Sequence, residues 1–377
     1  MKISDIKVVE ARTLPSAESI HEIYNTPERD VLVLNYTLAC PLSCDFCCYG
    51  CHPKRKEKMD LEAAKDLVSQ AAQMDNFSSV GLTGGEVFMF EDELISLSEH
   101  IANVGLRFTV ATSAHWAKTP LAADTLARTL VRNGLSRANI SFDYSHAQFV
   151  PARSIVNAAC AFSALGIPVF IVGTYFDAKD SLEAELEELR GVANIELFTR
   201  RVAKVGRATK ANIAYASTEV DSVKACYRRR HHDLVVFWDG EAYPCCSTFN
   251  RATKGISIGN AFKTPLRVLW QAVEYSRLIR TMKAQGFSKV IEIVRKYEPE
   301  FADRLPSLDE FPGACSYCNS IFSDSSLTQA IRAIFARYET EEIVSSMDEL
   351  NALLGEAAVA RLLQASISSA AMEVGNG

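Results

Sequence analysis

Short apolar, β-branched segments alternate with amphipathic helical segments from residue 31 to residue 198, and this alternation constrains the fold more than any other feature. The expected strands are Val31–Thr37, Ser79–Thr83, Arg107–Ala111, Asn139–Asp143, Ile167–Thr174 and Ile195–Phe198. The expected helices are Leu61–Met74, Leu94–Val104, Leu121–Val131, Ala152–Leu165 and Leu182–Arg190. Six such steps predict an α/β fold with parallel strands and right-handed crossovers. In such folds the chemistry lies at the carboxyl ends of the strands.

Three cysteines follow the first expected strand in the run C-P-L-S-C-D-F-C, which contains Cys40, Cys44 and Cys47. Three thiolates can bind three irons of a [4Fe–4S] cluster and leave the fourth iron open to a small molecule. The alternative is a structural zinc site. Zinc favours four ligands, commonly two close cysteine pairs, so a lone triple with one wider gap suits it less well.

The composition favours an enzyme of the cytoplasm. Net charge is −6 with acidic and basic residues mixed along the chain, so no basic face indicates nucleic acid or an anionic membrane. The N-terminal residues lack the basic-then-apolar order of a signal peptide, and no apolar run approaches membrane-spanning length. The 11 cysteines are clustered, which favours reduced thiols and iron over disulfides.

The cysteine run is followed, one β/α step later, by Gly81-Leu82-Thr83-Gly84-Gly85-Glu86. Together these motifs resemble the radical S-adenosylmethionine (SAM) superfamily. The resemblance implies an open, partial (β/α)6 barrel with a SAM-chelating [4Fe–4S] cluster at its mouth. It also implies that Glu86 receives the ammonium group of SAM. Glycines at 84 and 85 would let the backbone approach SAM, although a simple turn after a strand is the alternative.

Other strand-end residues are weaker candidates for SAM binding. The ring of Phe46, between two of the cysteines, can pack on a nucleobase. Ser113, Ser141 and Asp143 are placed to reach the ribose or carboxylate, but ordinary capping at strand ends explains them nearly as well. His146, in S-F-D-Y-S-H, is equally ambiguous.

A second group of cysteines begins at Cys226, in the pattern Cys-x13-Gly-x4-Cys that ends at Cys245. It predicts a hairpin turning at Asp239-Gly240, and the later pair Cys315 and Cys318 would complete four ligands. The pattern resembles the Twitch/SPASM modules that follow many radical SAM barrels, and with only one later pair it favours one auxiliary [4Fe–4S] cluster. Considered alone, these four cysteines suit tetrahedral zinc equally well.

Cys246 directly follows a proposed ligand, so on a strand the two side chains would point to opposite faces. One thiol could then bind the auxiliary cluster while the other faces the barrel mouth, where S–H is a good hydrogen-atom donor to a carbon radical. A half-buried structural cysteine is the alternative. The roles of Cys48 and Cys51 stay open.

The whole pattern resembles the epipeptide-forming radical SAM peptide epimerases over roughly residues 31–322. The shared segments are C-P-L-S-C-D-F-C-C-Y-G-C-H-P, L-T-G-G-E-V-F, S-F-D-Y-S-H-A-Q-F-V, D-G-E-A-Y-P-C-C-S and C-S-Y-C-N-S. The resemblance implies that Cys245 binds the auxiliary cluster and that Cys246 returns a hydrogen atom to the peptide. It also implies a ribosomal precursor peptide as substrate and an electron donor of the flavodoxin or ferredoxin type.

An alternative within the superfamily is a radical SAM/Twitch enzyme that forms a thioether or carbon–carbon crosslink, or that dehydrogenates a small molecule. The expected domains are an N-terminal extension (1–30), the barrel (31–205), a Twitch-like module (206–324) and a C-terminal helical segment (325–377). The two terminal segments are departures from the family, and they leave the identity of the precursor peptide open.

Overall fold

The computed structural model describes residues 8–9, 30–175, 184–189, 191–210, 233–311 and 313–364. Within them, ten strands form one sheet in the order β1-β7-β6-β5-β4-β3-β2-β8-β9-β10. The strands are β1 (Val8–Val9), β2 (Asp30–Asn35), β3 (Phe77–Thr83), β4 (Arg107–Thr112), β5 (Leu135–Ser141), β6 (Val169–Tyr175), β7 (Ile195–Arg201), β8 (Asp233–Phe237), β9 (Glu241–Tyr243) and β10 (Gly259–Asn260).

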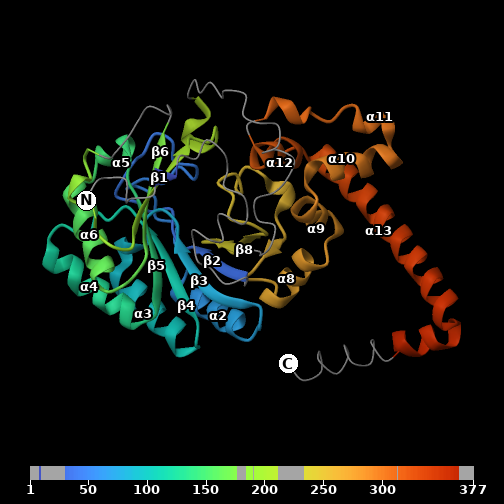
Figure 1. The fold of residues 1–377 in the computed structure, drawn as a ribbon, viewed down its shortest axis with the longest axis horizontal. Helices are drawn as coiled ribbons and strands as arrows, with labels where there is room; N and C mark the ends of the chain where they lie inside the picture. The colour runs from blue at the N-terminus through green and yellow to red at the C-terminus, as the bar shows by residue number, and fades with distance from the viewer. Residues whose placement is uncertain are drawn as a thin grey trace.

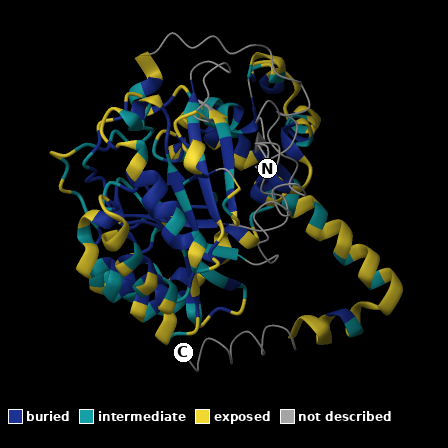
Figure 2. Ribbon diagram, turned by 60° about the vertical axis from the view of Figure 1, so that its left-hand side comes forward, coloured by how far each residue is buried: buried dark blue, intermediate teal, exposed yellow. Residues whose placement is uncertain are grey.

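Strands β2 to β7 pair in sequence order and in parallel, which confirms the predicted α/β fold with a parallel core. Helices line the outer face of this part of the sheet (Figure 1). They are α2 (Leu61–Ala72), α3 (Glu91–Asn103), α4 (Pro120–Arg132) and α6 (Ala152–Ala164), with the 3-10 turn η2 (Val87–Phe90) before α3. The short helix α5 (Tyr144–Ala147) instead follows the carboxyl end of β5. Their apolar stripes produce the first hydrophobic core against the strands, which Figure 2 shows as buried.

Local sequence signals set the ends of these helices. The Asp60 carboxylate accepts hydrogen bonds from the backbone N–H groups of Glu62 and Ala63, as expected for the start of α2. Gly105 and Gly166 follow α3 and α6 with φ of 81° and 76°, the left-handed conformation that ends helices.

One predicted helix is wrong in the described residues. Leu182–Arg190 was expected to be helical, but residues 184–189 contain only a turn and the 3-10 element η3 (Glu187–Leu189); residues 182–183 and 190 lie outside the described part. Leu186 and Leu189 are buried and the glutamates between them are exposed. A single 3-10 turn already aligns positions i and i+3, so it buries both leucines without a longer helix.

The second half of the chain continues the same sheet. Strand β8 pairs in parallel with β2, and β9 and β10 follow in antiparallel pairing. A second hydrophobic core lies between these strands and the later helices, with Tyr49 and Trp238 packed against both cores. The later elements are η4 (Gly206–Lys210), η5 (Lys254–Ile256), α8 (Leu266–Glu274), α9 (Arg277–Ala284), α10 (Gly286–Tyr297), α11 (Pro299–Ala302), η6 (Leu308–Glu310), α12 (Ala314–Phe322) and α13 (Ser325–Leu354).

The described part of the C-terminal segment is helical, as its periodicity predicted. Helix α13 packs its first turns on the second core through Ile331, Ile334 and Phe335. Its distal part extends away from the body of the protein (Figure 1) and is mostly exposed (Figure 2). Residues 356–364 form a further helical stretch.

Candidate functional site

The predicted cluster-binding cysteines lie on the loop that follows β2, and the first of them, Cys40, comes five residues after the strand ends. Cys40 and Cys44 are buried and Cys47 is half-buried. Burial raises the pKa of Cys40 to about 12, and Glu86, Cys44 and Cys47 add to the increase, while a backbone hydrogen bond opposes it. Cys40 is therefore close enough to Glu86 and to the other two thiols to interact electrostatically with each of them.

The glycine pair packs against the chain that leads into Cys40. The backbone N–H of Gly85 donates to the Thr37 carbonyl (2.6 Å), and that of Glu86 donates to the Ala39 carbonyl (2.8 Å). A Cβ at Gly84 would lie 2.5 Å from the Thr37 oxygen, and one at Gly85 would lie 2.2 Å from the Ala39 oxygen. These contacts require glycine at both positions whether or not SAM approaches them, so the turn serves the cluster loop as well.

Glu86 lies at the centre of a buried hydrogen-bond network. Its Oε2 accepts the backbone N–H (2.7 Å) and the hydroxyl (2.5 Å) of Ser113, and its Oε1 accepts the Thr112 hydroxyl (3.0 Å). His115 Nδ1 lies 3.6 Å from Oε2. Ser113, predicted to reach SAM itself, here orients the glutamate. Thr112, the last residue of β4, and His115, three residues after it, were not predicted from the sequence.

Helix α5 packs onto the cluster loop through its polar residues. Asp143 is fully buried; it caps α5 through the N–H groups of Ser145 and His146, and it accepts from His146 Nδ1 (2.8 Å). The Phe46 and His146 rings lie 5.8 Å apart. Burial favours neutral His146, but hydrogen bonds with Asp143 and Cys44 outweigh it and raise its pKa to about 10. Asp143 therefore caps a helix and orients the histidine that contacts Cys44.

Two further contacts complete the loop. The Ser145 hydroxyl hydrogen-bonds with the Asp45 carboxylate, and the Asp45 N–H donates back to the Ser145 oxygen (3.1 Å). The Cys51 N–H donates to the Cys47 sulfur at 3.3 Å. Hydrogen bonds from Cys51, chiefly from its side chain, lower the pKa of Cys47. Cys51 is thus a buried neighbour of a predicted ligand.

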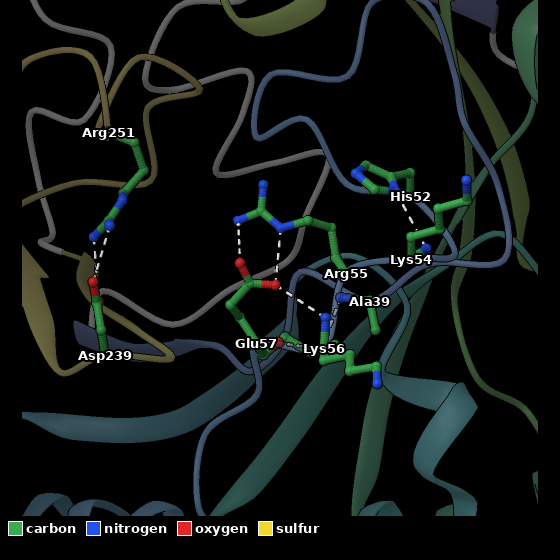
Figure 3. A network of polar contacts seen from close by, with 9 residues as sticks. Ala39, His52, Lys54, Arg55, Lys56, Glu57, Asp239 and Arg251 are labelled. Carbon is green, nitrogen blue, oxygen red and sulfur yellow. Dashed lines mark hydrogen bonds and ion pairs between the residues drawn. The ribbon is translucent and has the colours of Figure 1, made fainter.

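The loop continues into the basic segment shown in Figure 3. The backbone of His52 forms an isolated parallel β-bridge with Ala39, the residue before Cys40. Arg55 forms an ion pair with Glu57 through Nε and Nη2, both at 2.8 Å. In the same view Arg251 pairs with Asp239 of the β8–β9 turn (2.9 Å).

The hairpin turn at Asp239-Gly240 is present as predicted, and Gly240 has a φ of 82°. The expected strand alternation at Cys245 and Cys246 is wrong, because β9 ends at Tyr243 and both cysteines lie in the following irregular segment. Pro244 has no backbone N–H, which favours the end of strand pairing there. Both cysteines are half-buried against the second core.

Tyr49 joins this segment to the cluster loop. Its hydroxyl donates to the Ser247 carbonyl (3.4 Å), and its ring lies 5.2 Å from the Phe237 ring at 86°. Burial raises the pKa of Tyr49 well above its usual range, and the thiols of Cys48, Cys246 and Cys245 add to the increase. Cys246 therefore lies near Tyr49 of the cluster loop, a contact that was not predicted from the sequence.

Two of the remaining predicted auxiliary ligands, Cys315 and Cys318, lie in the described part of the chain. Cys315 and Cys318 are one turn apart on α12, both half-buried, and Cys318 packs against the same core as Cys245. Asn250 is fully buried, donating to the Cys245 carbonyl (2.8 Å) and lying 3.6 Å from its sulfur. Cys226 lies outside the described residues.

No three His, Cys, Asp or Glu side chains of the described residues are already gathered closely enough to hold a metal ion, so both ligand sets stay predictions. Ser141 ends β5 opposite Val172, is half-buried, and likewise stays a predicted SAM contact. In the described part of the chain, no helix is long and apolar enough to cross a membrane.

Family models match both halves of this site. Residues 34–190 match the radical SAM superfamily, and residues 226–293 match SPASM, an iron–sulfur cluster-binding domain. The chain carries a radical SAM domain followed by an SPASM domain. A radical SAM domain binds a [4Fe–4S] cluster and SAM, and the SPASM domain indicates additional iron–sulfur clusters. The predicted cofactor classes are thereby confirmed, whereas the Twitch subtype and a single auxiliary cluster stay predictions.

Among curated proteins, the chain is similar to the putative peptide biosynthesis protein YydG of Bacillus subtilis (strain 168). The two are 24% identical over 319 residues, which is 82% of this chain and 97% of YydG. Among solved structures, Streptococcus suis SuiB bound to its precursor peptide SuiA aligns with a TM-score of 0.50 and 16% identity. That alignment covers 70% of this chain and 69% of SuiB, and it supports the fold.

Proposed function

We propose that this chain is a radical SAM peptide epimerase that converts L-residues to D-residues in a ribosomally synthesised precursor peptide. The observation that carries the proposal is the position of Cys246 beside Tyr49 of the SAM-cluster loop. The similarity to a protein named for peptide biosynthesis, and the fold shared with SuiB, which was solved with a precursor peptide, support a peptide substrate.

In this proposal, different residues bind the cluster and SAM. Cys40, Cys44 and Cys47 would hold the SAM cluster, and Glu86, oriented by Thr112 and Ser113, would bind the SAM ammonium group. When bound, the cluster and SAM supply a 5′-deoxyadenosyl radical that can remove a Cα hydrogen. Phe46, Ser141 and Asp143 stay weaker proposals for SAM contacts.

Inversion then requires a hydrogen atom from the opposite face of the planar carbon. The Cys246 S–H bond breaks and a new Cα–H bond forms, which leaves a thiyl radical on Cys246. One electron and one proton restore the thiol, and a flavodoxin- or ferredoxin-type donor would supply the electron. Cys226, Cys245, Cys315 and Cys318 would hold an auxiliary [4Fe–4S] cluster.

The test compares Cys246→Ala with Cys160→Ala, a half-buried thiol on α6 far along the chain from either cluster motif. The substrates are short peptides encoded beside this gene. With Cys246→Ala we expect unchanged iron content, continued 5′-deoxyadenosine formation and no D-residue, whereas Cys160→Ala behaves as wild type. In heavy water the wild-type product should gain one mass unit at each inverted carbon.

Two results would overturn the proposal. One is normal epimerisation by Cys246→Ala. The other is a wild-type product that lacks two hydrogens, which would replace epimerisation by thioether or carbon–carbon crosslinking or by dehydrogenation.

A further inference from the structure

Arg207 lies in the turn η4, after β7, and donates three hydrogen bonds to the SAM-cluster loop. Its Nε donates to the Cys44 carbonyl (2.7 Å) and its Nη2 donates to the Cys51 carbonyl (2.7 Å). Its backbone N–H donates to the Cys47 carbonyl (3.1 Å). One residue therefore binds three carbonyls of a single loop, and each carbonyl belongs to a cysteine.

The turn that carries Arg207 is itself held in place. Val205 and Ala208 are buried, and the Ala208 N–H donates to the Val205 carbonyl (3.1 Å). Gly206 has a φ of 58°, and a Cβ there would lie 2.4 Å from the carbonyl oxygens of both Cys47 and Cys48. The backbone of η4 can approach the loop this closely only with glycine at that position.

The charge of Arg207 has no acidic partner in the described part of the chain, because all its hydrogen bonds go to backbone carbonyls. A guanidinium stays charged at any ordinary pH, and its rigid fork can hold two acceptors at once. A [4Fe–4S] cluster on three thiolates is anionic, and reduction adds one more negative charge. A fixed positive charge beside its loop therefore favours the reduced state.

We infer that Arg207 is a positioning residue for the SAM cluster with two effects. Its guanidinium restricts the backbone of the 44–51 loop in the metal-free protein, and its charge raises the reduction potential of the bound cluster. Because any radical SAM reaction needs this cluster reduced, the inference does not depend on epimerisation.

The experiment uses four variants of the full chain. Arg207→Gln removes both the fork and the charge, whereas Arg207→Lys keeps the charge and loses the fork. Gly206→Ala keeps the arginine and pushes η4 away from the loop. The matched control is Arg55→Gln, because Arg55 is a nearby arginine whose side chain pairs with Glu57 instead of with cysteine carbonyls.

The first readout is amide hydrogen exchange of the metal-free protein in peptides that cover residues 44–51. Loss of charge-assisted hydrogen bonds should make this segment exchange about tenfold faster in Arg207→Gln and Arg207→Lys. Gly206→Ala should raise exchange in the same segment, and Arg55→Gln should match wild type. Faster exchange spread over the whole chain in Arg207→Gln and Arg207→Lys would overturn the inference, because it would show general destabilisation.

The second readout is a redox titration of the reconstituted protein followed by electron paramagnetic resonance. The SAM cluster is identified by the change of its signal when SAM is added. Its potential should fall in Arg207→Gln and stay near wild type in Arg207→Lys and Arg55→Gln. The auxiliary signal, titrated in the same sample, should not shift. If Arg207→Gln matches Arg55→Gln in loop exchange or in cluster potential, the inference is wrong.

Discussion

The hydroxyl of Tyr49 donates a hydrogen bond to the carbonyl oxygen of Ser247, 3.4 Å away, although the two residues are 198 positions apart in the sequence. Tyr49 lies two residues after a predicted SAM-cluster ligand, and Ser247 directly follows Cys246. This contact joins the two halves of the proposed site. We expect it to help position the Cys246 thiol, because Cys246 directly precedes Ser247.

Tyr49→Phe should uncouple SAM cleavage from product formation. The variant keeps the ring on Phe237 and loses a hydrogen bond of about 1 kcal/mol. We expect iron content to stay unchanged and the ratio of 5′-deoxyadenosine to D-residue to rise about fivefold, because Cys246 is less well placed. The exposed Tyr275→Phe is the control. An unchanged ratio in Tyr49→Phe would show that the contact does not position the donor.

Gly85→Ala should impair the cluster loop and not SAM binding alone. The new Cβ would lie 2.2 Å from the Ala39 carbonyl oxygen, so the chain leading to Cys40 must move. We expect loss of iron from the SAM-cluster site and a lowered melting temperature. Gly166→Ala is the control: its Cβ meets open space, and only a backbone cost of about 1 kcal/mol applies. Full iron content in Gly85→Ala would contradict this expectation.

Glu86→Gln should weaken SAM binding while iron content is preserved. The amide keeps the size of the side chain among Thr112 and Ser113 but loses the charge that would face the SAM ammonium group. Hydrogen bonds to charged groups contribute about 1.5–3 kcal/mol, so affinity should fall roughly 10- to 100-fold. Calorimetric titration of SAM measures this. Glu188→Gln, an exposed residue paired with Arg153, should bind SAM as wild type does.

Replacing Cys40, Cys44 and Cys47 together with alanine should abolish SAM cleavage and leave about four irons if there is one auxiliary cluster. The described candidate ligands of the two sets lie on separate elements: the first three follow β2, whereas Cys245 lies beyond β9 and Cys315 and Cys318 lie on α12. Loss of the first set should therefore leave the second set intact. Metal analysis after anaerobic reconstitution measures the remaining ions. Zinc in place of the remaining iron would exclude the proposed auxiliary cluster.

Local signals in the sequence were sufficient for the barrel half. Amphipathic periodicity, the Asp60 cap and the glycines after α3 and α6 act within a few residues, so the order of strands and helices followed from them. The spacing of the first three cysteines likewise indicated the cofactor class. The helix predicted over residues 184–189 was wrong, because one 3-10 turn buries the two leucines there as well as a helix would.

Only the tertiary structure decided how the two halves meet. Nothing local indicates that β8 pairs in parallel with β2, and that pairing brings the segment of Cys245 and Cys246 to the cluster loop. The contacts of Tyr49 with Ser247, and of Arg207 with the cysteine carbonyls, join residues more than 150 positions apart. The sequence by itself determined which chemical groups are present and the local elements that carry them. The positions of those groups relative to one another depend on long-range strand pairing and side-chain packing, which no short window of sequence contains.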